Sequence, residues 1–189
     1  MKERILRAVV EEIQMSGMRF TVDNITERMG ISKKTIYEHF SSKEEIIQTI
    51  VERILKETDE KTNNIIADQT LTLIEKVKNL MLVLPEYYQI YDRPVLEGMK
   101  RYYPDLWQNI NDSLQEDWEE LEQIIEEGIK QGEVESNYST VVIMKVLIEA
   151  FNTTFDQGFF YQNNITVNEA LTQIVDILLY GIIPEDKRR

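Results

Sequence analysis

Cysteine is absent from this 189-residue chain, and glycine and proline are scarce, with seven and four residues. The missing cysteine excludes a disulfide framework and any zinc site built on thiolates. So few chain breakers over this length favour long helices and leave little room for many strands and tight turns. The composition therefore predicts an all-α protein.

Long apolar runs are absent too. No stretch approaches the roughly 18 apolar residues that a membrane span needs. The chain begins MKERI and continues as a charged amphipathic segment, unlike the uncharged apolar stretch of a signal peptide. We therefore expect a cytoplasmic protein that makes no contact with a membrane.

Motifs of catalysis and metal binding are also missing. His39 is the only histidine, and the chain has no G-x-S-x-G turn, no glycine-rich phosphate loop and no metal-spaced His/Cys set. Acidic pairs are plentiful, but on helices they are typical of a solvated surface. We expect no catalytic residue, no metal and no cofactor, which makes an enzyme the weaker interpretation.

The net charge of −13 is distributed unevenly along the chain. Residues 1–45 hold eight basic and eight acidic side chains, whereas residues 46–189 hold 13 basic and 26 acidic ones. Residues 33–43 alone contain three lysines and one glutamate. A local basic surface can therefore bind phosphate, while the acidic remainder suppresses non-specific attachment to DNA.

Apolar periodicity divides the N-terminal part into three helices. The first covers residues 2–16 and places its apolar side chains on one face. Thr21 is a favourable N-cap for the second helix, which Gly30 ends, and Ser32 caps a third helix that reaches His39. Two short helices joined by the residues MGIS have the length and glycine placement of a helix-turn-helix.

Lysines occupy the first turns of two predicted helices. Lys33 and Lys34 lie in the third helix, and Lys43 lies at the start of a fourth helix that follows it. Cations at these positions oppose the helix macrodipole by roughly 0.3–1 kcal/mol each when exposed, so stability alone would favour acids. When a phosphate docks at the helix N-terminus, the lysines become favourable there, because they and the backbone N–H groups bind the phosphate together. The pattern indicates an anionic partner, and ordinary solvated lysines are the alternative.

The remaining residues are also predicted to be helical. Residues 139–161 form one helix that is apolar almost all round, and a last helix covers residues 167–181. A helix of the first kind is buried on more than one side. Pairing of these two helices with the same pair from a second chain would form a four-helix interface, and the central core helix of a monomer is the alternative.

The segment GISKKTIYEHFSSKE, residues 30–44, resembles the DNA-binding signature of the TetR (tetracycline-repressor-like) regulators. The resemblance is specific over roughly residues 5–50. It implies an N-terminal three-helix helix-turn-helix domain at residues 1–45. It also implies a larger helical ligand-sensing and dimerisation domain at residues 46–189, with about nine helices, and a homodimer on double-stranded operator DNA.

The resemblance further implies roles for single residues. Lys33 and Lys34 fall where the family reads base edges, and Tyr37 falls where it contacts a thymine methyl group or a phosphate. The expected phosphate contacts are Thr21, Thr35, His39 and Lys43. These side chains suit their roles, since hydroxyl, imidazole and ammonium groups donate to phosphate oxygens. Asp23 departs from the pattern, because some members carry a base-reading arginine at that position.

Aromatic side chains are frequent in the middle of the chain, and the family generally places a small-molecule inducer in an apolar pocket. The candidate lining residues are Tyr87, Tyr91, Tyr103, Trp107, Trp118, Phe151 and Phe155. Aromatic residues at helical spacing are more often core residues, so simple burial is the alternative.

The sequence therefore predicts a DNA-binding transcriptional regulator. The expected mechanism is that of a repressor, which an unidentified small-molecule ligand releases from a palindromic operator. A helical interaction protein that keeps this fold without binding DNA is the alternative.

Overall fold

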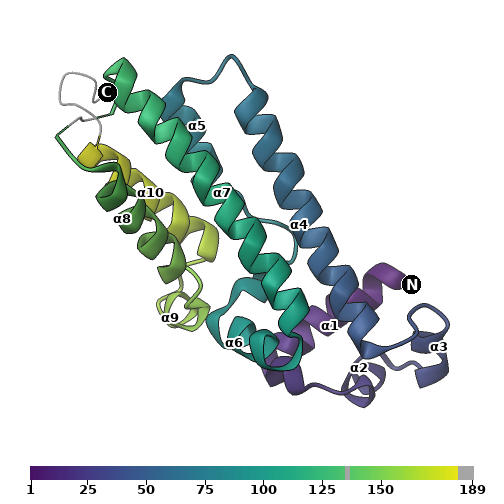
Figure 1. Ribbon diagram of the computed structural model, residues 1–189. Coiled ribbons are helices and arrows are strands. Elements are labelled where there is room, and N and C mark those ends of the chain that lie inside the picture. The colour runs from purple at the N-terminus through teal and green to yellow at the C-terminus, as the bar shows by residue number, and fades with distance from the viewer. Residues whose placement is uncertain (135–136, 183–189) are drawn as a thin grey trace. The chain divides into compact units, whose positions relative to one another are not determined.

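The computed structural model describes residues 1–134 and 137–182, which contain ten α-helices, two short 3₁₀ helices and no strand (Figure 1). The α-helices are α1 (Lys2–Ser16), α2 (Val22–Met29), α3 (Lys33–Tyr37), α4 (Lys43–Ala67), α5 (Leu73–Met81), α6 (Arg93–Tyr102), α7 (Pro104–Gln131), α8 (Thr140–Thr153), α9 (Gln157–Gln162) and α10 (Val167–Ile182). The 3₁₀ helices are η1 (Gly17–Arg19) and η2 (Tyr88–Tyr91). The all-α prediction is confirmed. Within the described residues, no helix combines the length and apolar character that a membrane crossing requires.

The chain forms two compact units. The first combines Met1–Glu57 with Pro85–Asp112, and the second combines Thr58–Leu84 with the described residues from Ser113 onward. Helices α1, α2, α3 and α6 lie wholly within the first unit, and α5, α8, α9 and α10 within the second. A functional division of the chain at residue 45 stays a prediction.

α1 supplies an apolar face to the core of the first unit. The side chains of this face, none more than 4% exposed, are Ile5, Leu6, Val9, Val10 and Ile13. α2 and α3 are too short to be stable alone. Each therefore depends on a buried isoleucine, Ile25 in α2 and Ile36 in α3, both fully inaccessible to solvent.

η1 connects α1 to α2 and packs closely against α6. A Cβ atom at Gly98 of α6 would lie 2.9 Å from Cγ of Met18 in η1. That separation is shorter than a van der Waals contact, so the missing side chain of Gly98 allows the close approach. α6 thus joins the N-terminal helices in one core, an association that the sequence analysis did not anticipate.

The second unit is built around α10, which packs against α5 and α8 (Figure 1). Each helix contributes apolar side chains at helical spacing to the core. The buried set includes Val77, Met81, Leu121, Ile125, Ile143, Leu147, Leu171 and Val175.

The prediction of one helix over residues 139–161 is wrong. α8 ends at Thr153, and α9 begins at Gln157. The carboxylate of Asp156 accepts a hydrogen bond from the backbone N–H of Phe159 at 3.3 Å and so acts as the N-cap of a new helix. Apolar periodicity continues across this break, which explains why the pattern alone did not reveal it.

Candidate nucleic-acid interface

Side-chain caps and a glycine set the ends of α2 and α3. The Thr21 hydroxyl accepts from the backbone N–H of Asn24 (3.3 Å), whose side-chain oxygen accepts from the backbone N–H of Thr21 (2.8 Å). Gly30 ends α2 with φ of 64°, a left-handed conformation that costs other residues roughly 1–2 kcal/mol. Ser32 caps α3 by accepting from the backbone N–H of Thr35 (3.1 Å). Both predicted N-caps are confirmed.

α3 buries one side and exposes the other. It ends at Tyr37, and the chain continues as a turn through His39, so the helix is shorter than predicted. Ile36 and Phe40 anchor the segment, with exposed fractions of 0% and 2%. Tyr37 is 49% exposed, and Lys34 is exposed as well. The segment therefore presents both side chains outward, as the predicted DNA-reading surface requires.

Lys33 and Lys34 differ in their surroundings. Nζ of Lys33 lies 2.8 Å from Oδ1 of Asp23, and this hydrogen bond raises the pKa of Lys33. Both partners are exposed, so the pair is weak and can be exchanged for a DNA contact. Among the described residues, none forms an ion pair or side-chain hydrogen bond with the Lys34 ammonium. Lys34 is thus the α3 cation most accessible to an anionic partner.

The ammonium of Lys43 is bound within the first unit. Nζ donates hydrogen bonds to the carbonyl oxygens of Met18 (2.9 Å) and Phe20 (2.6 Å) and lies 3.9 Å from the centroid of the Phe20 ring. Burial lowers the pKa of Lys43. The side chain joins the start of α4 to η1, so the structure does not bring it to the exposed side of α3. Its contact with a phosphate stays a prediction.

The other predicted phosphate contacts lie near the ends of α2 and α3. Thr21 is exposed at the start of α2. The hydroxyl of Thr35 lies 3.0 Å from that of Ser32 and is partly exposed. His39 is partly exposed in the turn after α3. Each keeps some accessible surface, and their phosphate contacts stay predictions.

A buried carboxylate holds α2 against α1. Glu12 is 6% exposed, and its Oε2 accepts from Nη2 (2.8 Å) and Nε (3.2 Å) of Arg28. The Ser16 hydroxyl and the Arg28 guanidinium lower the pKa of Glu12. Removing one partner would leave a buried charge unpaired, so this geometry fixes the position of α2. The sequence analysis missed this pair, because sixteen residues separate its members.

The N-terminal segment matches a known family. Residues 5–50 match the family model described as bacterial regulatory proteins, tetR family. This match groups residues 5–50 with the N-terminal segment of TetR-family regulators. The matched residues include α2, α3 and the first turns of α4, which are the elements that build the exposed surface of α3.

Similarity to other transcriptional regulators extends over nearly the whole chain. The uncharacterized HTH-type transcriptional regulator YvaF of Bacillus subtilis (strain 168) is 26% identical over 187 residues, which cover 99% of this chain and 98% of YvaF. The MbdR regulator from Azoarcus sp. CIB has a TM-score of 0.79 at 19% identity, covering 96% of this chain and 98% of MbdR. FadR from Bacillus subtilis, solved in complex with stearoyl-CoA, has a TM-score of 0.63 at 21% identity, covering 95% and 98%.

The seven aromatic residues predicted to line a ligand pocket fall in both compact units. The first unit contains Tyr87, Tyr91, Tyr103 and Trp107, and the second contains Trp118, Phe151 and Phe155. In the second unit, the Trp118 and Phe151 rings meet edge to face with centroids 5.1 Å apart, and Phe151 and Phe155 meet at 5.0 Å. These contacts form an aromatic cluster, whose role in ligand binding stays a prediction.

A groove of about 600 Å³ lies in the second unit between the end of α4, α5 and α7. Leu73 and Ile124 contribute apolar lining, while Lys76, Glu120 and Glu127 contribute charge. None of the seven predicted aromatic residues lines it. The groove is therefore a second candidate position for a ligand, one that the sequence analysis did not identify.

Asp117 of α7 is a partly buried carboxyl group. Burial, together with the negative charges of Asp59, Glu120 and Glu116, raises its pKa to about 7. The expectation that helical acids lie on a solvated surface is therefore wrong at Asp117, because part of its surface is removed from water. No group of three or more acidic or histidine side chains in the described residues is placed to hold a metal ion.

Asp117→Asn should make the protein more stable at pH 8 than the wild type. A carboxyl group whose pKa is raised by folding binds its proton more tightly in the folded state, so stability falls as the pH rises from about 4 to above 7. Asparagine has no proton to lose, and we expect a gain of roughly 1 kcal/mol after allowance for solvent screening. Unfolding should be measured at pH 5 and pH 8. Glu119→Gln, an exposed position of α7, should show no such pH dependence, and an equal gain at both pH values would contradict the assignment.

Proposed function

We propose that this protein is a dimeric transcriptional repressor that binds a two-fold operator and releases it when a small molecule binds. The match of residues 5–50 to the TetR-family model and the similarity to YvaF support a DNA-binding transcriptional regulator. The observation that carries the proposal is the outward presentation of Lys34 and Tyr37 on a capped, core-anchored α3. We place its action in the cytoplasm, where the operator lies.

In the proposed complex, α3 enters the major groove. Lys34 and Lys33 donate to guanine O6 and N7, and Tyr37 contacts a thymine methyl group or a phosphate. Lys33 first exchanges its ion pair with Asp23, which is weak because both groups are exposed. Phosphate oxygens accept from the hydroxyl groups at the helix ends, which fixes the register of the protein on the duplex.

Lys34→Ala should weaken binding to the DNA upstream of this protein's own gene. The expected loss is roughly 5- to 150-fold, the range for one lost base contact. Fluorescence anisotropy with a labelled duplex measures this change. Lys130→Ala removes an exposed lysine from the second unit and should bind like the wild type. Equal affinities of the wild type and Lys34→Ala would contradict the proposal that α3 contacts the DNA.

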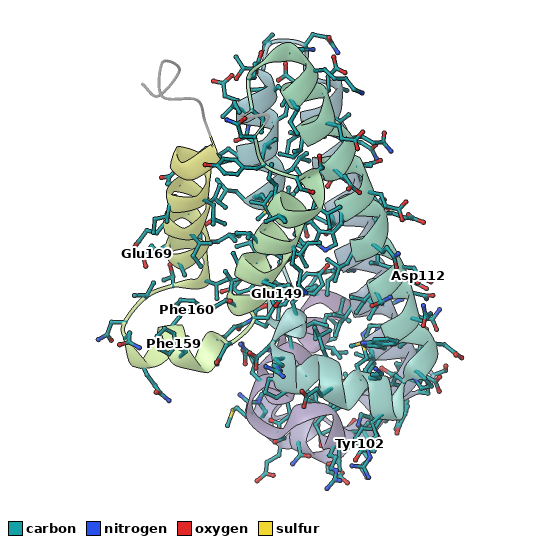
Figure 2. The ribbon with its side chains drawn as sticks, turned by 60° about the vertical axis from the view of Figure 1, so that its left-hand side comes forward. Tyr102, Asp112, Glu149, Phe159, Phe160 and Glu169 are labelled. Atoms are coloured by element: carbon teal, nitrogen blue, oxygen red, sulfur yellow. The ribbon has the colours of Figure 1, made fainter. Side chains whose placement is uncertain are left out.

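Exposed apolar side chains on the C-terminal helices support the dimer. Val141 and Val142 of α8 are 72% and 58% exposed, and Ile177 of α10 is 72% exposed. In α9, Phe159 is exposed while Phe160 is buried (Figure 2). Exposed large apolar side chains, when they form a contiguous patch, mark interaction surfaces. The structure thus argues against α8 as the central core helix of a monomer, and we propose an interface through residues 139–161 and 167–181.

The double variant Val142→Glu, Ile177→Glu should be a monomer, because the interface would place like charges in an apolar contact. Both positions are exposed in the single chain, so its fold should survive. Sedimentation velocity measures the mass, with Gln115→Glu of α7, another exposed position, as the control. A double variant that sediments as a dimer would place the interface elsewhere.

The ligand is proposed to be an apolar small molecule that binds the DNA-free conformation better than the DNA-bound one. The Trp118, Phe151 and Phe155 cluster supplies aromatic surface for such a molecule. FadR of Bacillus subtilis was solved with stearoyl-CoA, so a long acyl-CoA is the first probe to use.

A ligand of this kind should raise the unfolding temperature, since binding to the folded state stabilises it by RT ln(1 + [L]/Kd). Stearoyl-CoA is tested first by thermal shift, followed by free fatty acids and other apolar acids. Trp118→Ala should reduce the shift, whereas Ile124→Ala in the groove should not. If Ile124→Ala reduced the thermal shift and Trp118→Ala did not, the ligand would instead be assigned to the groove.

The alternative, a helical interaction protein without DNA binding, is favoured by the Asp23–Lys33 ion pair and by the internal position of the Lys43 ammonium. Both reduce the positive charge available to DNA. A gel shift with the upstream DNA at low salt discriminates, because this alternative gives no shift.

A further inference from the structure

Three exposed residues of the first unit, Arg19, Arg101 and Tyr102, form a compact basic and aromatic cluster. Lys100, also exposed, precedes Arg101 in the chain, and its ammonium lies 4.5 Å from the centroid of the Trp107 ring. We call these four residues, Arg19, Lys100, Arg101 and Tyr102, the Tyr102 patch. Nε of Arg19 donates a hydrogen bond to Oη of Tyr102 at 2.6 Å. The guanidinium carbons of Arg19 and Arg101 lie 5.7 Å and 5.5 Å from the centroid of the Tyr102 ring. Figure 2 shows Tyr102 on the outside of its unit. The two arginines are therefore held together on one ring rather than dispersed in water.

The patch cations are paired differently from four other arginines of the first unit, which form ion pairs with carboxylates: Arg7 with Glu86, Arg28 with Glu12, Arg53 with Glu3, and Arg93 with Glu97. Within the described residues, no carboxylate lies in ion-pair distance of a patch cation. Acids outnumber bases by 13 in this chain, so three cations without an acidic partner form a local positive potential.

Helix stability explains only part of this arrangement. Lys100 and Arg101 lie in the last turn of α6, where cations are favourable to the helix macrodipole. Arg19 belongs to η1, outside α6, and its placement has no such cause. It reaches across to Tyr102 and adds a third positive charge to the end of α6. Stability alone would not favour this addition, whereas an anionic partner would.

The position of Arg19 identifies the partner. It precedes Thr21, the N-cap of α2 and a proposed phosphate contact, by two residues. Two residues of extended chain span about 7 Å at most, so the patch adjoins the proposed DNA surface. Oη of Tyr102 accepts from Arg19 and keeps its own hydrogen, which can be donated to a phosphate oxygen.

We infer that the Tyr102 patch binds phosphates of the operator backbone beside the segment that α3 reads. The inference rests on the proposed function. It adds a contact from α6 that lies outside the helix-turn-helix and carries no base specificity. The arginines are already stacked on an aromatic ring, so little side-chain freedom is lost on binding.

The test is the salt dependence of DNA binding by the double variant Lys100→Ala, Arg101→Ala. Each lost phosphate contact reduces the slope of log K against log salt by about 0.9, which at 0.1 M salt corresponds to about an eightfold loss of affinity. The loss should be equal on the upstream DNA and on a random duplex, because phosphates carry no sequence. Arg101→Lys keeps the charge and should retain the wild-type slope.

Arg93→Ala is the matched control, since it removes an exposed arginine from the other end of α6. Its slope should equal that of the wild type, and the unfolding temperature of each variant confirms that its fold is intact. A wild-type slope for the double variant, together with weakened binding by Lys34→Ala, would overturn the phosphate contact of the Tyr102 patch and leave the proposed function standing. That result would point to an acidic protein as the partner of the patch. Absence of DNA binding by the wild type would instead overturn the proposed function.

Discussion

The proposed DNA-reading surface depends on two buried side chains beneath a helix of five residues. α3 is far shorter than an isolated helix must be to persist in water. Ile36 and Phe40 hold it on the core of the first unit, and the Ser32 cap satisfies its first turn. Burial of two such side chains contributes on the order of 3–6 kcal/mol. The orientation of Lys34 and Tyr37 is a consequence of that anchoring.

Much of this anchoring was predictable from the sequence, because it depends on local rules. The apolar spacing of α1, the glycine between α2 and α3, and both N-caps follow from helix periodicity and capping chemistry, and the structure confirms them. The break between α8 and α9 was not predictable in this way. It depends on one capping carboxylate, Asp156, inside a segment whose apolar pattern continues.

The side chains that sequence reasoning placed least well are those whose surroundings come from distant segments. Lys43 was expected at a phosphate, but its ammonium is bound by the Met18 and Phe20 carbonyls of a segment more than twenty residues away. Asp117 was expected on a solvated face, but burial changes its protonation. Helical periodicity predicts on which face of its helix a side chain lies. It does not predict which distant segments that side chain contacts.

The free energy of base recognition by α3 also bears on the dimer proposed for the C-terminal helices. In the proposed complex, one α3 offers Lys33 and Lys34 to base edges, and good base contacts are worth about 1–3 kcal/mol each. One copy would then supply about 2–6 kcal/mol of discrimination, below most of the roughly 4–10 kcal/mol that separates specific from non-specific binding. Two copies on a two-fold site would supply about twice as much. A reading helix this short would therefore need a second copy, and the exposed valines of α8 belong to the interface proposed for it.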